Sequence, residues 1–228
     1  MIKFQKKTYG NFYLLDDTSK LYNEETIIRY IEKYNYDVVK LEISKSVKYL
    51  SEIASEFAKK EYCFVSLGKG GEILAKLLHG MKDIINTINL EYSQIIIHNR
   101  VISYKTDLDR YDWKNKKIVI LEDVIYTGDT LYNFIRRVKD HGGNPCAVLT
   151  CIACDDCNIK LESISPHIDI TSYYMISKDN GVLPPLYSYR HLLYGEGEWC
   201  EFFDYIGDLY FSGNKNLKNI IVSGTQIP

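Results

Sequence analysis

From Tyr62 onward the chain alternates short apolar runs with other segments, and this alternation limits the possible folds more than any other feature. The apolar runs span residues 62–67, 92–98, 118–121 and 147–150. Helical periodicity, with apolar residues three and four positions apart, follows the first run and the third. Runs that are apolar throughout are typical of strands buried on both faces, and helices between them indicate parallel pairing. We therefore predict an α/β fold with a central, mostly parallel sheet flanked by helices.

The segments outside this alternation predict a small addition to the sheet. An apolar stripe from Val47 to Ala58 predicts one more helix, so the α/β core is expected over about residues 45–176. The first forty residues predict a short extended piece and a helix near 24–32, and the tail from Ser177 is irregular and rich in aromatic residues. We expect residues 1–44 and 177–228 to form a cap within a single domain spanning 1–228.

Composition excludes several classes of protein. The 228 residues carry a net charge of -2 and are 46% apolar, which excludes disordered, collagen-like and membrane classes. No apolar run approaches the ~20 residues that cross a bilayer, and the first residues lack the apolar stretch of a secretory signal. We expect a cytoplasmic protein without a membrane partner. Binding of duplex nucleic acid needs an excess of basic residues, so no nucleic-acid partner is expected either.

Chemistry concentrates in residues 118–130. An apolar strand there ends in the adjacent acids Glu122 and Asp123, and a turn over residues 127–130 leads directly into a helix. The carboxyl ends of parallel strands bind ligands, and a helix start offers amide groups and partial positive charge to a phosphate. Carboxylates repel phosphate, so the two acids are expected to face sugar hydroxyls or a divalent cation.

All thirteen positions from 118 to 130 resemble the phosphoribosyl-pyrophosphate (PRPP) motif of the type I phosphoribosyltransferases, which have a Rossmann-like fold. The resemblance implies that Glu122 and Asp123 bind the ribose hydroxyls and hold Mg²⁺, directly or indirectly, as catalytic residues. It also implies a turn that holds the 5′-phosphate through Tyr126, Thr127, Gly128, Asp129 and Thr130.

A glycine-rich turn after the first apolar run resembles the pyrophosphate loop of the hypoxanthine-guanine members. The resemblance implies that Lys69, Gly70 and Gly71 contact pyrophosphate, although Gly68 is an extra residue relative to that loop. A Walker loop would need Ser or Thr after Gly-Lys, and the dinucleotide fingerprint would need Gly in place of Ile73. Both alternatives therefore fail.

A polar segment over residues 99–117 predicts a long loop, which is uncommon within a compact domain and often functional. Ser103 and Tyr104 resemble the Ser-Tyr pair of the loop that closes over the active site in the purine branch. Lys105 or Arg110 could instead play the part of the loop cation of orotate members. An exposed connection without a catalytic role is the alternative.

Tyr126 departs from the hypoxanthine-guanine pattern, in which an Asp at this position faces the purine. Tyrosine cannot act as a carboxylate base, and pyrimidine-operon regulators of this fold carry Tyr here, so the motif leaves the acceptor open. The resemblance implies Mg²⁺-dependent transfer of ribose-5-phosphate from PRPP to a nucleobase-like acceptor, as in purine salvage, by a homodimer. The alternatives are a PRPP or nucleotide sensor without transfer activity and a transferase with another acceptor.

Three cysteines, Cys151, Cys154 and Cys157, have a spacing that iron–sulfur and zinc sites use. Cys151 falls at the end of a predicted strand, where alternate residues face opposite sides of the sheet. This placement favours reduced thiols over a metal site.

Overall fold

The computed structural model describes residues 2–9, 12–15, 28–29, 32, 37–81, 87–90, 93–97, 100–105, 108–155 and 167–176. The chain divides into two compact units, one of residues 1–8 with 44–178 and one of residues 9–43 with 179–228. In the second unit, β2 (Phe12–Leu15) pairs in parallel with β3 (Val38–Leu41). Most of the helix predicted near 24–32, and the whole tail 177–228, lie outside the described residues.

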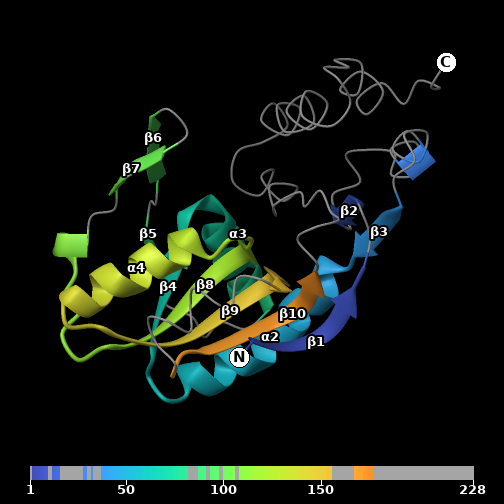
Figure 1. Ribbon diagram of the computed structural model, residues 1–228. Coiled ribbons are helices and arrows are strands. Elements are labelled where there is room, and N and C mark those ends of the chain that lie inside the picture. Colours follow the sequence, from blue (N-terminus) through green and yellow to red (C-terminus); the bar gives the residue numbers. More distant parts are fainter. Residues whose placement is uncertain are drawn as a thin grey trace. The chain divides into compact units, whose positions relative to one another are not determined.

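A six-stranded sheet forms the centre of the larger unit (Figure 1). Its order is β1-β10-β9-β8-β4-β5, and every neighbouring pair is parallel. The strands are β1 (Ile2–Thr8), β4 (Cys63–Leu67), β5 (Thr87–Leu90), β8 (Lys117–Ile125), β9 (Asn144–Cys154) and β10 (Asp169–Ile176). The predicted α/β fold with a mostly parallel sheet is thus confirmed.

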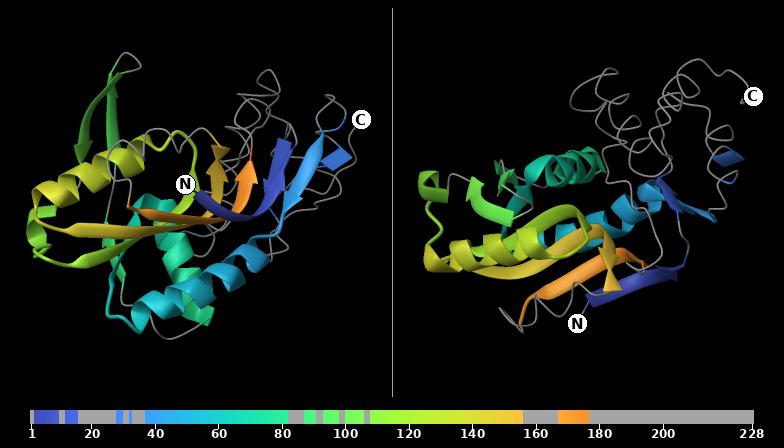
Figure 2. Two further views of the ribbon diagram at one scale, coloured as in Figure 1. Left: turned by 60° about the horizontal axis from the view of Figure 1, so that its bottom comes forward. Right: turned by 45° about the horizontal axis from the view of Figure 1, so that its top comes forward.

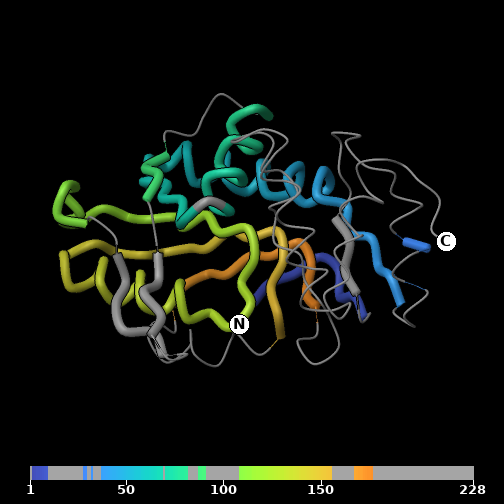
Figure 3. The backbone as a smooth tube through the Cα atoms, turned by 90° about the horizontal axis from the view of Figure 1, so that it is seen from above, coloured from blue at the N-terminus to red at the C-terminus, as the bar shows by residue number. Residues whose placement is uncertain are grey.

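Helices cover both faces of this sheet, with α2 (Ile43–Ala58) and α3 (Gly68–Met81) on one face and α4 (Asp129–Asp140) on the other (Figures 2 and 3). Each follows the pattern that predicts it; α4, for example, buries Leu131, Phe134, Ile135 and Val138 against the sheet. Among the described residues, no helix is long and apolar enough to span a membrane.

The chain leaves the neighbouring strands β4 and β8 in opposite directions. From β4 it passes through α3 to β5, and from β8 it passes through α4 to β9 on the other side. Because such crossovers are right-handed, the two helices lie on opposite faces and their starts diverge above the same pair of strands. Open α/β sheets bind ligands at a switch point of this kind, beyond the carboxyl ends of the strands.

Burial explains why the central strands are recognisable in the sequence. Residues 118–121 of β8 and 147–149 of β9 are almost completely buried, as expected for strands covered on both faces. Each large apolar side chain removed from water in this way contributes about 1.5–3 kcal/mol relative to an exposed one.

The prediction for residues 87–117 was wrong in two respects. The strand beside β4 is the short edge strand β5, which carries no continuous apolar run. The stronger run that follows forms β6 (Ser93–Ile97), which pairs with β7 (Arg100–Lys105) in an antiparallel hairpin outside the main sheet. The first part of the predicted loop is therefore a strand, because alternation on one hairpin strand can look polar.

The N-terminal strand also differs from the prediction. Residues 2–8 were assigned to the cap, but they form β1 and pair along β10 at an edge of the main sheet. Polar side chains hide this strand in the sequence, since only Ile2 and Thr8 of its seven residues are buried.

Candidate functional site

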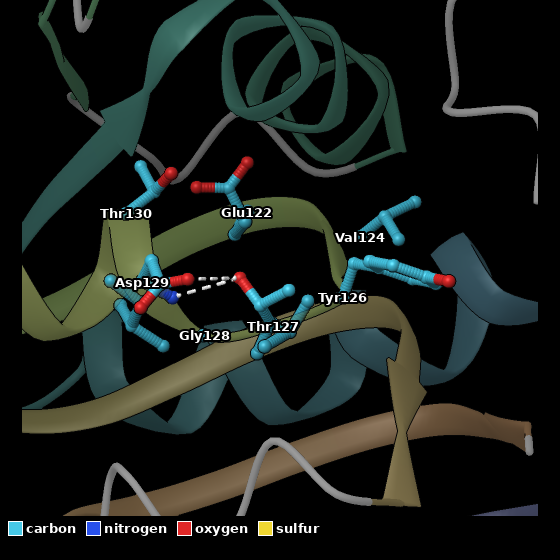
Figure 4. A pocket seen from close by; sticks show the side chains of 9 residues that line it. Glu122, Val124, Tyr126, Thr127, Gly128, Asp129 and Thr130 are labelled. Carbon is cyan, nitrogen blue, oxygen red and sulfur yellow. Dashed lines mark hydrogen bonds between the residues drawn. The ribbon is translucent and has the colours of Figure 1, made fainter. Parts of the chain in front are cut away.

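The turn between β8 and α4 is built around Gly128. Its φ of 77° lies in the left-handed region that favours glycine, and this residue caps the start of α4. The Thr127 hydroxyl donates to the Asp129 carboxylate (2.8 Å) and accepts from the Asp129 backbone N–H (3.3 Å), as Figure 4 shows. The N–H of Tyr132 donates to the Gly128 carbonyl (2.8 Å) and closes the first helical turn. The start of α4 is therefore held in one conformation.

A cavity of about 120 Å³ opens at this turn. It is lined by Glu122, Val124, Ile125, Tyr126, Thr127, Gly128, Asp129, Thr130 and Leu131 (Figure 4). Sites that enclose a whole drug-sized ligand measure roughly 300–1,000 Å³, so this cavity has room for one phosphate-sized group and not for PRPP as a whole. The five turn residues predicted to hold the phosphate all lie together around it.

Glu122 presents an unsatisfied oxygen at this cavity. Its Oε2 is buried and has no hydrogen-bond partner among the described residues. Burial raises the pKa of the Glu122 carboxyl well above its usual range, and the neighbouring Asp123 raises it further through its charge and a side-chain hydrogen bond. Buried polar atoms in proteins are nearly always paired, so this oxygen indicates a missing donor such as a ligand hydroxyl or a cation.

Asp123 takes a different direction from its neighbour. Its side chain is only 6% exposed, and it is not among the residues that line the cavity. The carboxylate instead fills the space beside the α-carbon of Gly70, in the first turn of α3. The Asp123 carbonyl accepts a hydrogen bond from the buried Thr150 hydroxyl (3.0 Å). The two adjacent acids therefore serve different surroundings.

The glycines of the upstream turn lie against β8. Gly68 has a φ of 59°, so the extra residue noted in the sequence supplies the left-handed step from β4 into α3. A Cβ on Gly71 would lie 2.5 Å from the Leu121 carbonyl oxygen, and one on Gly70 would overlap the Asp123 carboxylate. The first turn of α3 thus packs directly on β8. The side chain of Lys69 lies outside the described residues.

The predicted lid residues Ser103, Tyr104 and Lys105 fall on β7, where the backbone is described and the side chains are not. Arg110 is exposed on the short 3₁₀ helix η1 (Leu108–Arg110). The structure therefore brings together the residues of the phosphate turn and Glu122, and leaves the side chains of the lid unplaced.

Two of the three spaced cysteines are described. Cys151 and Cys154 are buried in β9, and burial raises the pKa of the Cys151 thiol, with a smaller contribution from the charge of Asp123. Cys157 lies outside the described residues. Within the part of the chain that the structure describes, no group of three or more His, Cys, Asp or Glu side chains could hold a metal ion.

Sequence reasoning missed the contacts that join the two turns. The apolar cavity residues Val124, Ile125 and Leu131 follow from the motif once the strand is extended to Ile125. The contact between Gly70 and Asp123 joins residues 53 positions apart, and the only signal for it was the pair of adjacent glycines at a helix start.

The sheet order, the switch point between β4 and β8 and the phosphate turn define the type I phosphoribosyltransferase class. Residues 4–219 match the PRTase-CE family, and the chain belongs to it. The chain is also 51% identical over 39 residues to the transcriptional regulator GfcR of Methanobrevibacter smithii. That match covers 17% of this chain and only about a fifth (19%) of the regulator.

Solved structures with a similar fold include two named phosphoribosyltransferases. One is a hypoxanthine phosphoribosyltransferase from Staphylococcus aureus, with 16% identity, a TM-score of 0.43, and coverage of 59% of this chain and 74% of that one. Another is the adenine phosphoribosyltransferase of Rhodothermus marinus, with 17% identity, a TM-score of 0.45, and coverage of 58% and 78%. The AQ2163 protein from Aquifex aeolicus has 20% identity, a TM-score of 0.47, and coverage of 59% and 65%.

Proposed function

We propose that this protein transfers ribose-5-phosphate from PRPP to a ring nitrogen of a nucleobase-like acceptor and releases pyrophosphate. The observation that carries the proposal is the shared cavity, in which the phosphate turn of α4 faces the unsatisfied Glu122 oxygen at the switch point of the sheet. Membership of the PRTase-CE family supports the same class of chemistry.

The turn would hold the 5′-phosphate through the amide groups that begin α4, and Glu122 would accept a hydrogen bond from a ribose hydroxyl. In the transfer, the bond from C1 of the sugar to pyrophosphate breaks and its electron pair leaves with pyrophosphate. The acceptor nitrogen supplies the pair for the new C1–N bond and loses its proton. Positive charge develops on the sugar ring meanwhile, so the protein contributes mainly positioning and electrostatic stabilisation.

Mg²⁺ fits this arrangement as a cofactor. A buried carboxylate oxygen without a partner among the described residues suits a hard cation, and Mg²⁺ is commonly bound through one or two carboxylates together with substrate phosphates. Glu122 would hold the ion, directly or through water, with Asp123 behind it. When bound, Mg²⁺ supplies charge neutralisation at the leaving pyrophosphate.

The remaining parts of the proposal concern residues around the cavity. Lys69 and the amides of Gly70 and Gly71 would contact pyrophosphate, and the hairpin that carries Ser103, Tyr104 and Lys105 would close the site against water. Tyr126, at 42% exposure on the cavity, stands where the acceptor would approach. We also propose a role in purine salvage, a cytoplasmic location and a homodimeric state.

Calorimetric titration of the full chain with ribose 5-phosphate, and with PRPP and Mg²⁺, tests the phosphate site. Gly128→Ala is the informative variant and Gly142→Ala its matched control, because both glycines have left-handed φ angles (77° and 83°) at opposite ends of α4. Each alanine adds about 1–2 kcal/mol of backbone strain. We expect only Gly128→Ala to weaken binding, by at least about tenfold. Equal affinities for the two variants, or no binding by the unmodified protein, would refute the proposal.

A second candidate is a regulator that binds PRPP or a nucleotide without transferring it. The local similarity to the regulator GfcR and the tyrosine at position 126 favour this alternative. Pyrophosphate release from PRPP, measured over a panel of bases, separates the two. Release with any base supports the transferase, whereas tight binding without release supports the sensor.

A further inference from the structure

We propose that Asp123 is a positioning residue that fixes the first turn of α3 on β8 and does not itself bind the ribose. This inference rests on the proposed function, because it assigns the two acids of the motif to two different parts of PRPP. Glu122 would serve the ribose-5-phosphate cavity, and Asp123 would set the position of the turn that receives pyrophosphate.

The first step of the argument is the divergence of the two side chains. Glu122 lines the cavity with a buried oxygen that lacks a partner among the described residues. Asp123 is buried, is not part of the cavity lining, and contacts α3 at Gly70. A side chain in that place has no room to reach a sugar seated at the α4 turn.

The second step is the fit between Asp123 and α3. Its carboxylate occupies the space that a Cβ of Gly70 would need, so the contact exists only because residue 70 is glycine. Gly71 makes the equivalent close approach to the Leu121 carbonyl. A negative charge beside the start of a helix is favourable, typically by about 0.3–1 kcal/mol. Carboxylate and helix turn therefore fit each other in both shape and charge.

The third step is the rigidity of the strand that carries Asp123. β8 lies between β4 and β9, and the Thr150 hydroxyl of β9 donates to the Asp123 carbonyl. A site is held most accurately when its supporting residue stands on a fixed strand. Asp123 can thus transmit the position of β8 to the turn at residues 68–71, whose amides would meet pyrophosphate.

The test compares ligands that contain only one of the two parts. The full chain is titrated with ribose 5-phosphate, with pyrophosphate and Mg²⁺, and with PRPP and Mg²⁺. The variants are Asp123→Asn, which keeps the shape of the side chain, and Gly70→Ala, which pushes the carboxylate away. Gly80→Ala is the control on the same helix, because a Cβ there meets nothing within 4 Å. Glu122→Gln serves as the comparison within the cavity.

We expect Asp123→Asn and Gly70→Ala each to weaken pyrophosphate and PRPP by about tenfold, equivalent to 1.4 kcal/mol, with ribose 5-phosphate changed less than about twofold. Their combination should cost little more than either alone, since both break one contact. Glu122→Gln should show the reverse pattern with ribose 5-phosphate, and Gly80→Ala should change none of the three.

Equal weakening of ribose 5-phosphate and PRPP by Asp123→Asn would overturn the inference, because it would assign Asp123 to the ribose. An unchanged affinity for all three ligands would overturn it as well. Should Gly70→Ala fail to fold, the single variant Asp123→Asn still decides. If the unmodified protein binds none of the ligands, the proposed function fails and the inference with it.

Discussion

The starts of α3 and α4 follow the same local plan and reach opposite results. Each helix follows a parallel strand, and a glycine with a left-handed φ (59° at Gly68, 77° at Gly128) makes the connection. At α4 the space in front of the helix is a cavity. At α3 the first turn is pressed onto β8, with the Asp123 carboxylate and the Leu121 carbonyl filling that space.

The difference teaches that glycine-rich turns of similar sequence can serve two physical purposes. In the α4 turn, glycine allows the backbone to reverse and leaves amide groups for a ligand. In the α3 turn, glycine allows a helix and a strand to approach more closely than any side chain would permit. The following experiments test this contrast, from the largest expected effect to the smallest.

The close packing at α3 predicts a large loss of stability for Gly71→Ala. The new Cβ would lie 2.5 Å from the Leu121 carbonyl oxygen and 3.3 Å from the Ser66 carbonyl carbon, and backbone atoms cannot rotate away. We expect the free energy of unfolding to fall by about 3 kcal/mol, as for other overpacked sites. Gly80→Ala, on the same helix with open space around it, should raise it by up to about 1 kcal/mol. Urea unfolding measures both, and equal effects would contradict the packing described for α3.

Glu122→Gln should stabilise the protein at neutral pH. The pKa of Glu122 is raised in the folded protein, mainly by burial, so its favourable contribution is complete below the unfolded pKa of about 4.3 and is lost as pH rises through the folded pKa. Glutamine does not titrate, so the variant should gain roughly 1–2 kcal/mol at neutral pH and nothing near pH 4. Thermal unfolding against pH checks this.

Glu52→Gln, on the exposed face of α2, is the control for that experiment and should show no such pH dependence. A Glu122→Gln variant that is less stable than the original at neutral pH would mean that the cavity oxygen is paired. The gain in stability should accompany a loss of ribose 5-phosphate binding, as expected for a residue kept for function.

Asp129→Asn should strengthen the binding of inorganic phosphate. The Asp129 carboxylate lines the cavity and accepts the hydrogen bond of the Thr127 hydroxyl, so it repels an incoming anion and competes for the same donor. Two like charges 4 Å apart in water cost about 1 kcal/mol, which predicts up to about fivefold tighter binding. Asp140→Asn, exposed at the far end of α4, should leave the affinity unchanged. Weaker binding by Asp129→Asn would show that its carboxylate orders the turn for the ligand.

The far end of α4 gives the smallest effect. His141 Nδ1 lies 2.7 Å from the Arg137 carbonyl oxygen and Nε2 lies 3.0 Å from the Asp109 carboxylate, and both partners are acceptors. These contacts raise the pKa of His141, so its stabilisation is complete below about pH 6.5 and is lost as pH rises through the folded pKa. The pair is exposed and screened, so His141→Gln should cost a few tenths of a kcal/mol at pH 6 and less at pH 9. His167→Gln, at another exposed position, should show no such trend.

The sequence predicted the parts of the fold that depend on local pattern. The strand, turn and helix over 117–140 follow from an apolar run, a Thr-Gly turn and a 3.6-residue stripe, and the structure contains all three. The strands that it missed, β1 and β5, lie at the two edges of the sheet, where exposed residues interrupt the apolar pattern. Period alone cannot identify a strand with one buried side.

The candidate site was predictable to the same degree. The turn residues are neighbours in sequence, so the motif placed them together correctly around one cavity. The partner of Asp123 is Gly70, and such a contact depends on the strand order, which brings β8 beside β4. Adjacent acids in a sequence carry no information about which of them faces a ligand.

The edge strand β1 has a consequence for how copies of this chain could associate. Lys3 pairs with Asp169 (2.8 Å), Lys7 with Asp155 (3.8 Å), and the Lys6 ammonium lies 5.7 Å from the centre of the Tyr174 ring. A second β1 added alongside would bring two rows of ammonium groups together, and lysines on an edge strand are a common protection against such pairing. Continuous sheet growth from molecule to molecule through β1 is therefore disfavoured, and this charge pattern protects the protein against fibre-like aggregation.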